Sequence, residues 1–84
     1  MKITFKLYAS LTEYLPPAAR RDNRIELEVA ADATIAQIIE PLGMPPKLVH
    51  LVLVNGSYVA PAQRQTQTLQ PGDVLAIWPP IAGG

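Results

Sequence analysis

The chain has 84 residues, 49% of them hydrophobic and 17% charged, which allows one small folded domain and leaves no room for a second. Its 7 basic and 7 acidic side chains cancel, so there is no basic surplus with which to bind nucleic acid. The absence of cysteine excludes disulfides and thiolate chemistry, no apolar run approaches the length of a membrane span, and we expect a soluble cytoplasmic protein.

The first third of the chain predicts two strands. Residues 2–8 alternate apolar and polar side chains, which is the pattern of a strand with one buried face. A short helical turn is expected over residues 9–15, where two prolines end it, and an exposed loop over residues 17–23. The same alternation returns over residues 24–29 and predicts the second strand.

The middle of the chain carries the one predicted helix. Thr34 is a typical N-cap residue, and Gln37 three residues later completes a capping box. The apolar residues that follow at helical spacing are Ile35, Ile38, Ile39 and Leu42. Pro41 should keep this helix short, and Gly43 is a natural end for it.

The second half of the chain predicts a longer strand, a short strand and a final strand. The most apolar strand covers residues 48–54 and runs into Asn55-Gly56, a strong signal for a tight turn. A short return strand over residues 57–59 is followed by a polar connection without regular structure over residues 60–68. The last strand covers residues 74–78, after a Pro-Gly-Asp turn.

This order of elements is the layout of a β-grasp, ubiquitin-like roll of the α+β class. One main helix covers only one face of a mixed sheet of four or five strands, so the other face is left for water or a partner. The first and last strands can lie parallel and side by side, because the helix supplies the long crossover. We expect a β-grasp domain over residues 1–78 and a flexible, extended C-terminal tail over residues 79–84.

The predicted open face carries aromatic side chains. If Leu75 and Ile77 join the core, Trp78 points away from it. Tyr8 then lies beside Trp78, and Tyr58 extends the patch. Exposed aromatic residues are favoured binding anchors, so we interpret these three as partner-binding residues. The alternative is that Trp78 folds over the edge of a small core and covers it.

The titratable side chains indicate neither a metal site nor an enzyme. His50 is the single histidine, so no paired-histidine metal site can form, and its apolar surroundings predict a half-exposed strand residue. Glu26 and Glu28 alternate with apolar residues, which favours a solvated strand face over a catalytic carboxylate pair. We expect no metal and no cofactor on this chain.

The segment after the last strand suits an arm that enters a partner's active site. Pro79-Pro80 cannot extend a sheet ladder and favours an extended chain, which Ile81-Ala82 continues. Gly83 and Gly84 have no Cβ, so the tip can enter a channel too narrow for other residues. We expect the α-carboxylate of Gly84 to be the reacting group; the alternative is a frayed end without a role.

Four segments carry a resemblance that covers essentially the whole chain. They are Leu7-Tyr8-Ala9-Ser10-Leu11, Val54-Asn55-Gly56, Leu69-Gln70-Pro71-Gly72-Asp73-Val74 and Trp78-Pro79-Pro80-Ile81-Ala82-Gly83-Gly84. On these residues the chain resembles the MoaD/ThiS family of ubiquitin-like sulfur carriers, most of all the small subunits of molybdopterin synthases. The closing segment is the most specific part of the resemblance.

The resemblance implies a carrier that is not an enzyme on its own. An E1-like adenylyltransferase would use ATP to adenylate the Gly84 carboxylate, and a sulfurtransferase or cysteine desulfurase would supply the sulfur for a thiocarboxylate. The carrier would then donate sulfur for molybdopterin, in a heterotetramer with a molybdopterin synthase large subunit. Tyr8, Tyr58 and Trp78 match positions where the family contacts its partners.

Other functions remain open at this point. The ending Ile81-Ala82-Gly83-Gly84 also fits sulfur carriers of thiamine biosynthesis or of another thiolation pathway. A ubiquitin-like protein modifier would use the same adenylated carboxylate with a lysine amine as the nucleophile. A simple interaction domain would make no use of the terminal glycines.

Overall fold

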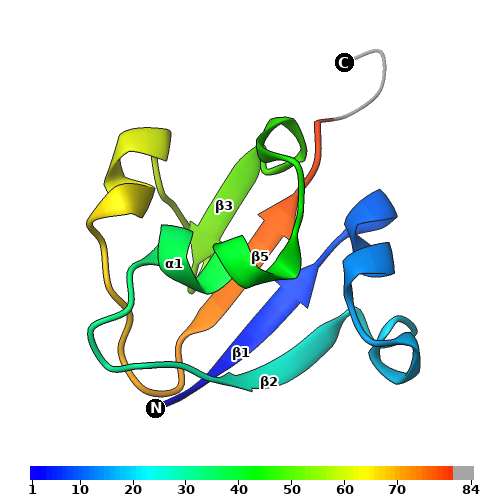
Figure 1. Cartoon of the computed structure of the whole chain (residues 1–84), viewed down its shortest axis with the longest axis horizontal. Helices are drawn as coiled ribbons and strands as arrows, with labels where there is room; N and C mark the ends of the chain where they lie inside the picture. The colour runs from blue at the N-terminus through cyan, green and yellow to red at the C-terminus, as the bar shows by residue number, and fades with distance from the viewer. Residues whose placement is uncertain (81–84) are drawn as a thin grey trace.

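The computed structural model describes residues 1–80, which form a mixed five-stranded sheet with one α-helix packed on one face (Figure 1). The elements are β1 (Lys2–Leu7), η1 (Ala9–Tyr14), η2 (Pro17–Ala19), β2 (Arg24–Glu28), α1 (Ile35–Ile39), η3 (Glu40–Leu42), η4 (Pro46–Leu48), β3 (Leu51–Val54), β4 (Ser57–Tyr58), η5 (Pro61–Gln65) and β5 (Val74–Trp78), where η marks a 3-10 helical turn. This is the predicted β-grasp, ubiquitin-like fold.

The last strand of the chain lies in the middle of the sheet, whose strand order is β2-β1-β5-β3-β4. β5 runs parallel to β1, with Phe5 opposite Leu75, and antiparallel to β3, with Val52 opposite Ile77. Parallel neighbours need a long crossover, which the α1 region supplies. The predicted adjacency of the first and last strands is therefore confirmed.

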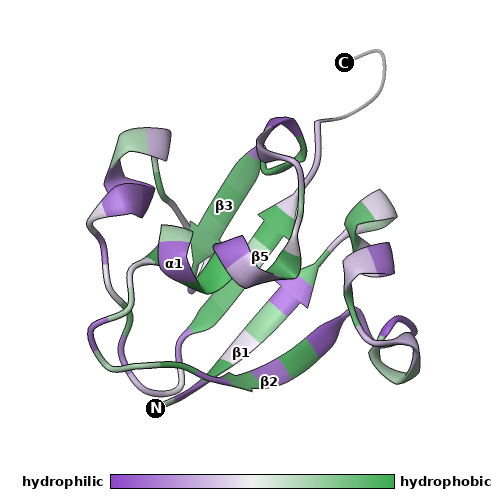
Figure 2. Ribbon diagram, viewed as in Figure 1, coloured by the Kyte–Doolittle hydropathy of each residue, from purple (hydrophilic) through white to green (hydrophobic). Residues whose placement is uncertain are grey.

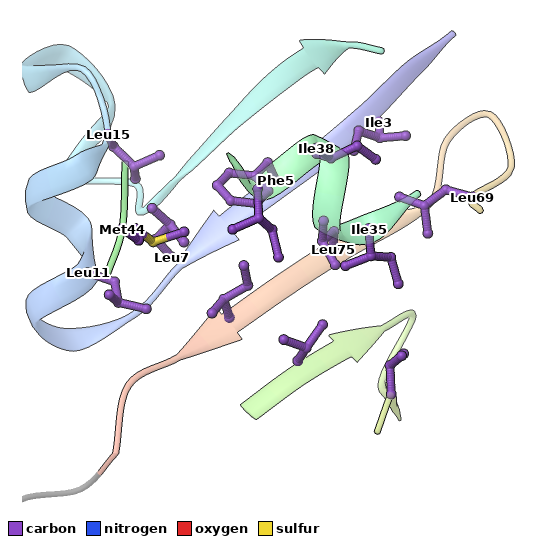
Figure 3. Packing of buried hydrophobic residues seen from close by; sticks show 14 residues of the cluster. Ile3, Phe5, Leu7, Leu11, Leu15, Ile35, Ile38, Met44, Leu69 and Leu75 are labelled. Carbon is purple, nitrogen blue, oxygen red and sulfur yellow. The ribbon is translucent and has the colours of Figure 1, made fainter. Parts of the chain in front are cut away.

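One face of the sheet packs against α1 and forms the core. Ile35 and Ile38 point from α1 toward the buried side chains of β1 and β5 (Figure 3). The buried hydrophobic residues of this cluster are Ile3, Phe5, Leu7, Leu11, Leu15, Ile35, Ile38, Ile39, Met44, Val52, Val59, Leu69, Leu75 and Ile77. The predicted register is confirmed, because Leu75 and Ile77 are fully buried.

The ends of α1 follow the predicted capping chemistry. The Thr34 hydroxyl accepts a hydrogen bond from the Gln37 N–H at 3.2 Å, and the Gln37 side-chain oxygen accepts from the Thr34 N–H at 2.9 Å. The α-helix ends at Ile39 and continues as the 3-10 turn η3, which contains Pro41. Gly43 ends this turn at φ 74°, a left-handed conformation that suits glycine.

The predicted strand over residues 48–54 begins too early. Leu48 belongs to the 3-10 turn η4, and β3 begins only at Leu51. The cause is the pair Pro45-Pro46, whose rings fix the backbone and start a turn with Pro46 as its first residue. His50 therefore precedes the strand and is exposed, not a half-exposed strand residue.

Two segments predicted as irregular contain ordered turns. Residues 60–68 include η5, and Arg64 from this turn is buried with only 8% of its surface exposed. Residues 17–23 include η2, after which the Arg20 guanidinium donates to the carbonyls of Leu15 and Glu13 at 3.1 and 3.0 Å. In both segments an arginine satisfies backbone carbonyls, a role that composition alone does not reveal.

Neither a membrane-crossing helix nor a metal-binding cluster occurs in the described part of the chain. Within residues 1–80 no helix combines the length and the apolar character that a membrane span requires. The same residues contain no group of three or more His, Asp and Glu side chains placed to hold a metal ion.

The capping box should stabilise the folded state measurably. We expect Thr34→Ala to lower the free energy of unfolding by about 1 kcal/mol, because the Gln37 N–H in the first turn of α1 loses its hydrogen-bond acceptor. Thr34→Ser keeps the accepting oxygen and should stay within a few tenths of a kcal/mol of the parent chain. Urea denaturation measures both; equal losses would show that the hydroxyl is not the cause.

Candidate functional site

An aromatic pair marks the point where the chain leaves the sheet. Trp78, the last residue of β5, stacks on Tyr8, with ring centroids 4.1 Å apart and an angle of 4° between the ring planes. Neither residue belongs to the core cluster, and each is partly buried. The structure thus places this pair on the open face, as the predicted register requires, and the alternative of Trp78 covering the core edge does not hold.

Backbone hydrogen bonds hold the end of β5 from both sides. The Tyr8 N–H donates to the Ile77 carbonyl at 3.1 Å, and the His50 N–H donates to the Trp78 carbonyl at 3.2 Å. Pro79 and Pro80 follow directly and have no N–H with which to continue the ladder. The sheet therefore ends at a fixed point beside the aromatic pair.

Apolar side chains from β3 and β4 continue the open face. Leu51 lies opposite Trp78, and Leu53 lies opposite both Ala76 and Tyr58, so these side chains share one face of the sheet. Among the described residues Tyr58 is the one large hydrophobic side chain that is mostly exposed, at 56%. We call the following five residues the apolar patch: Tyr8, Leu51, Leu53, Tyr58 and Trp78.

Sequence reasoning found the aromatic members of the apolar patch and missed the two leucines. The signal was present, because Val52 faces the core and the side chains of a strand alternate, which turns Leu51 and Leu53 outward. Which residues of β3 face outward depends on where the strand begins, and that boundary was predicted wrongly.

The other half of the open face is charged. The Lys2 ammonium lies 3.9 Å from the Glu26 carboxylate, and the N-terminal ammonium of Met1 lies 3.5 Å from the Glu28 carboxylate. Figure 2 shows the alternation of hydrophilic and hydrophobic residues along β2 that turns these glutamates outward. Glu26 and Glu28 form a solvated face, as predicted, and each has a cation as its neighbour.

The predicted tail falls largely beyond this part of the chain. Pro79 is partly buried and Pro80 is exposed. Ile81, Ala82, Gly83 and Gly84 lie outside the described residues, so the reacting carboxylate and the flexible arm stay predictions.

The aromatic stack should appear as a coupling energy between its two members. We expect a double-mutant cycle with Tyr8→Ala and Trp78→Ala to give a coupling of about 0.5–1.5 kcal/mol in the free energy of unfolding. Tyr58→Ala in place of Tyr8→Ala serves as the control, because Tyr58 pairs with Leu53 and not with Trp78. An additive result for Tyr8 and Trp78 would contradict the stacking interaction.

Several solved structures share this fold. The chain is similar to SAMP1 from Haloferax volcanii, with a TM-score of 0.71 and 23% identity over 100% of both chains. A second structure, of H. volcanii small archaeal modifier protein 1, gives a TM-score of 0.65 and 23% identity over 95% of this chain and 98% of that one. A Pyrococcus furiosus protein assigned as molybdopterin converting factor, subunit 1, gives a TM-score of 0.68 and 20% identity over 96% of this chain and 99% of that one.

Sequence comparison adds the family. Curated proteins give no significant match. The family model described as Mut7-C ubiquitin matches residues 1–82, nearly the whole chain. Together with the solved structures, this match confirms the ubiquitin-like fold that the sequence indicated. The chain belongs to the Mut7-C ubiquitin family.

Proposed function

We propose that this protein is a ubiquitin-like sulfur carrier of the molybdopterin synthase type, with the carboxylate of Gly84 as the group that carries sulfur. The observation that supports it most is the geometry at the end of β5. The central strand stops at Trp78 beside the apolar patch, and two residues without an N–H follow at once. A surface for docking and a chain exit thus lie next to each other.

The chemistry of such a carrier explains why the domain needs no catalytic side chains. A carboxylate is anionic at neutral pH and a poor electrophile. An E1-like adenylyltransferase would transfer AMP from ATP to the carboxylate and release pyrophosphate. Sulfide then displaces AMP and leaves a thiocarboxylate, whose sulfur is the nucleophile in the partner's pocket. The partners supply ATP, acid–base groups and the acceptor, while this chain supplies the reacting terminus.

The length of the tail would link docking to reaction, because it limits how far the terminus can lie from the apolar patch. Six residues from Pro79 to Gly84, fully extended, reach roughly 20 Å at most. A partner that covers the apolar patch would therefore receive the terminus in a pocket within that radius, at a high effective concentration. The two prolines reduce the freedom of the first part of the arm, which lowers the entropy lost on binding.

A second candidate is a protein modifier. The solved structures of similar fold include one named small archaeal modifier protein 1, which favours this alternative. The modifier would use the same adenylated Gly84, with a lysine amine in place of sulfide as the nucleophile. Sulfur transfer for thiamine or another acceptor would use the thiocarboxylate with a different partner. Isopeptide-linked adducts on a denaturing gel would support the modifier. The identity of the large partner that is pulled down with the chain would distinguish the molybdopterin pathway from the other sulfur-transfer pathways.

The terminal carboxylate can be tested by intact mass. After incubation with ATP, the E1-like adenylyltransferase and sulfide, the protein should gain the mass difference between sulfur and oxygen. The same spectrum shows whether the mature protein ends at Gly84. Deletion of Gly84 should leave the denaturation midpoint unchanged and abolish the mass gain. Sulfur loading of the truncated protein would refute the proposal.

The apolar patch can be tested by placing one charge on either half of the open face. We expect Leu53→Lys to weaken docking to the adenylyltransferase about tenfold or more, because it puts an ammonium group at the centre of an apolar contact. Thr4→Lys makes the same charge change in the charged half, opposite Glu26, and should stay within about twofold. The KM for sulfur loading measures both, and equal effects would contradict docking through the patch.

A further inference from the structure

Arg64 is the one buried charged side chain in the described part of the protein. Its guanidinium donates three hydrogen bonds to backbone carbonyls: Nε to Val59 at 3.1 Å, Nη1 to Val49 at 3.2 Å and Nη2 to His50 at 3.1 Å. Within residues 1–80 no carboxylate lies at ion-pair distance from it. One rigid planar group therefore joins the residue after β4 to the two residues before β3.

These contacts reach Trp78 through a single peptide plane. The carbonyl of Val49, which accepts from Arg64, and the N–H of His50 belong to the same peptide unit. That N–H donates to the Trp78 carbonyl at 3.2 Å. Because a peptide unit is planar and rigid, holding its carbonyl also fixes the direction of its N–H. Arg64 is thus two hydrogen bonds away from the last residue of β5.

The Trp78 carbonyl in turn belongs to the peptide unit that begins Pro79. Neither Pro79 nor Pro80 has an N–H, so neither can hold the chain's direction by a backbone donor. The orientation of the Trp78 carbonyl therefore sets the direction in which the chain leaves the sheet. His50 provides the donor, and Arg64 orients that donor.

We propose that Arg64 is a positioning residue for the reacting terminus, a role that deepens the proposed function and rests on it. It holds the Val49–His50 peptide so that the chain leaves β5 in one direction while the apolar patch is docked. Burying a cation without a carboxylate partner costs free energy. An apolar side chain at this place, beside Ile39 and Met44, would avoid that cost. We attribute the arginine at this place to its directional hydrogen bonds, which orient the Val49–His50 peptide.

The test compares matched arginine variants. Arg64→Met keeps the length of the side chain and removes its donors, and Arg64→Lys keeps the charge without the planar fork. Arg20→Met is the control, because Arg20 also donates to two backbone carbonyls, of Leu15 and Glu13, and neither belongs to β3 or β5. All variants are measured at a temperature where the parent and the variants are folded.

Two readouts separate positioning from general stability. We expect the His50 amide of Arg64→Met to exchange with solvent about tenfold faster, with the Tyr8 amide unchanged. In sulfur loading with ATP, the adenylyltransferase and sulfide, kcat should fall about tenfold while KM stays within about twofold, because the apolar patch is intact. Arg64→Lys should lie between Arg64→Met and the parent. Arg20→Met should match the parent in both readouts.

The outcomes distinguish this inference from the proposed function. Unchanged His50 exchange, an effect on KM alone, or an equal loss of kcat in Arg20→Met would overturn the role of Arg64. Failure of the parent chain to accept sulfur would overturn the proposed function. In that case the exchange of the His50 amide still decides whether Arg64 orients the Trp78 carbonyl. If Arg64→Met does not fold, Arg64→Lys carries the same comparison.

Discussion

The pairing of β5 with a strand on each side is the constraint on which the rest of the molecule depends. Because β5 is central, its alternation sets both faces at once: Leu75 and Ile77 enter the core, while Trp78 turns toward Tyr8 on the open face. A slip of one residue would bury the tryptophan and expose the core residues. The burial of the core residues therefore determines on which face of the sheet the aromatic pair lies.

Much of this arrangement is predictable from local patterns in the sequence. The alternation in the first and last strands, the capping box at Thr34 and the Asn-Gly turn each depend on residues within a few positions of one another. The burial of Arg64 depends on carbonyls 14 and 15 residues away, so a short polar window gives no sign of it. The start of β3 was predicted wrongly because Leu48 and Val49, which precede the strand, are as apolar as the strand residues from Leu51 onward.

A sulfur carrier and a protein modifier require the same two features of the folded domain: a docking surface, and a C-terminal segment that leaves the sheet beside that surface. They differ only in the nucleophile that attacks the adenylated carboxylate. Either proposed function would therefore place the acid–base groups of the reaction on a partner. The open face joins an apolar half to a charged half, so a partner can gain affinity from one and orientation from the other.

The edges of the sheet have a further consequence. A protein with an apolar open face is at risk of growing into larger assemblies, because an unpaired strand can template another chain. Here β4 is only two residues long, and β2 alternates charged residues along its length. Both edges are therefore poor templates for pairing with a strand of a second molecule. If the protein carries sulfur as proposed, such edges would help one partner release it before the next partner binds.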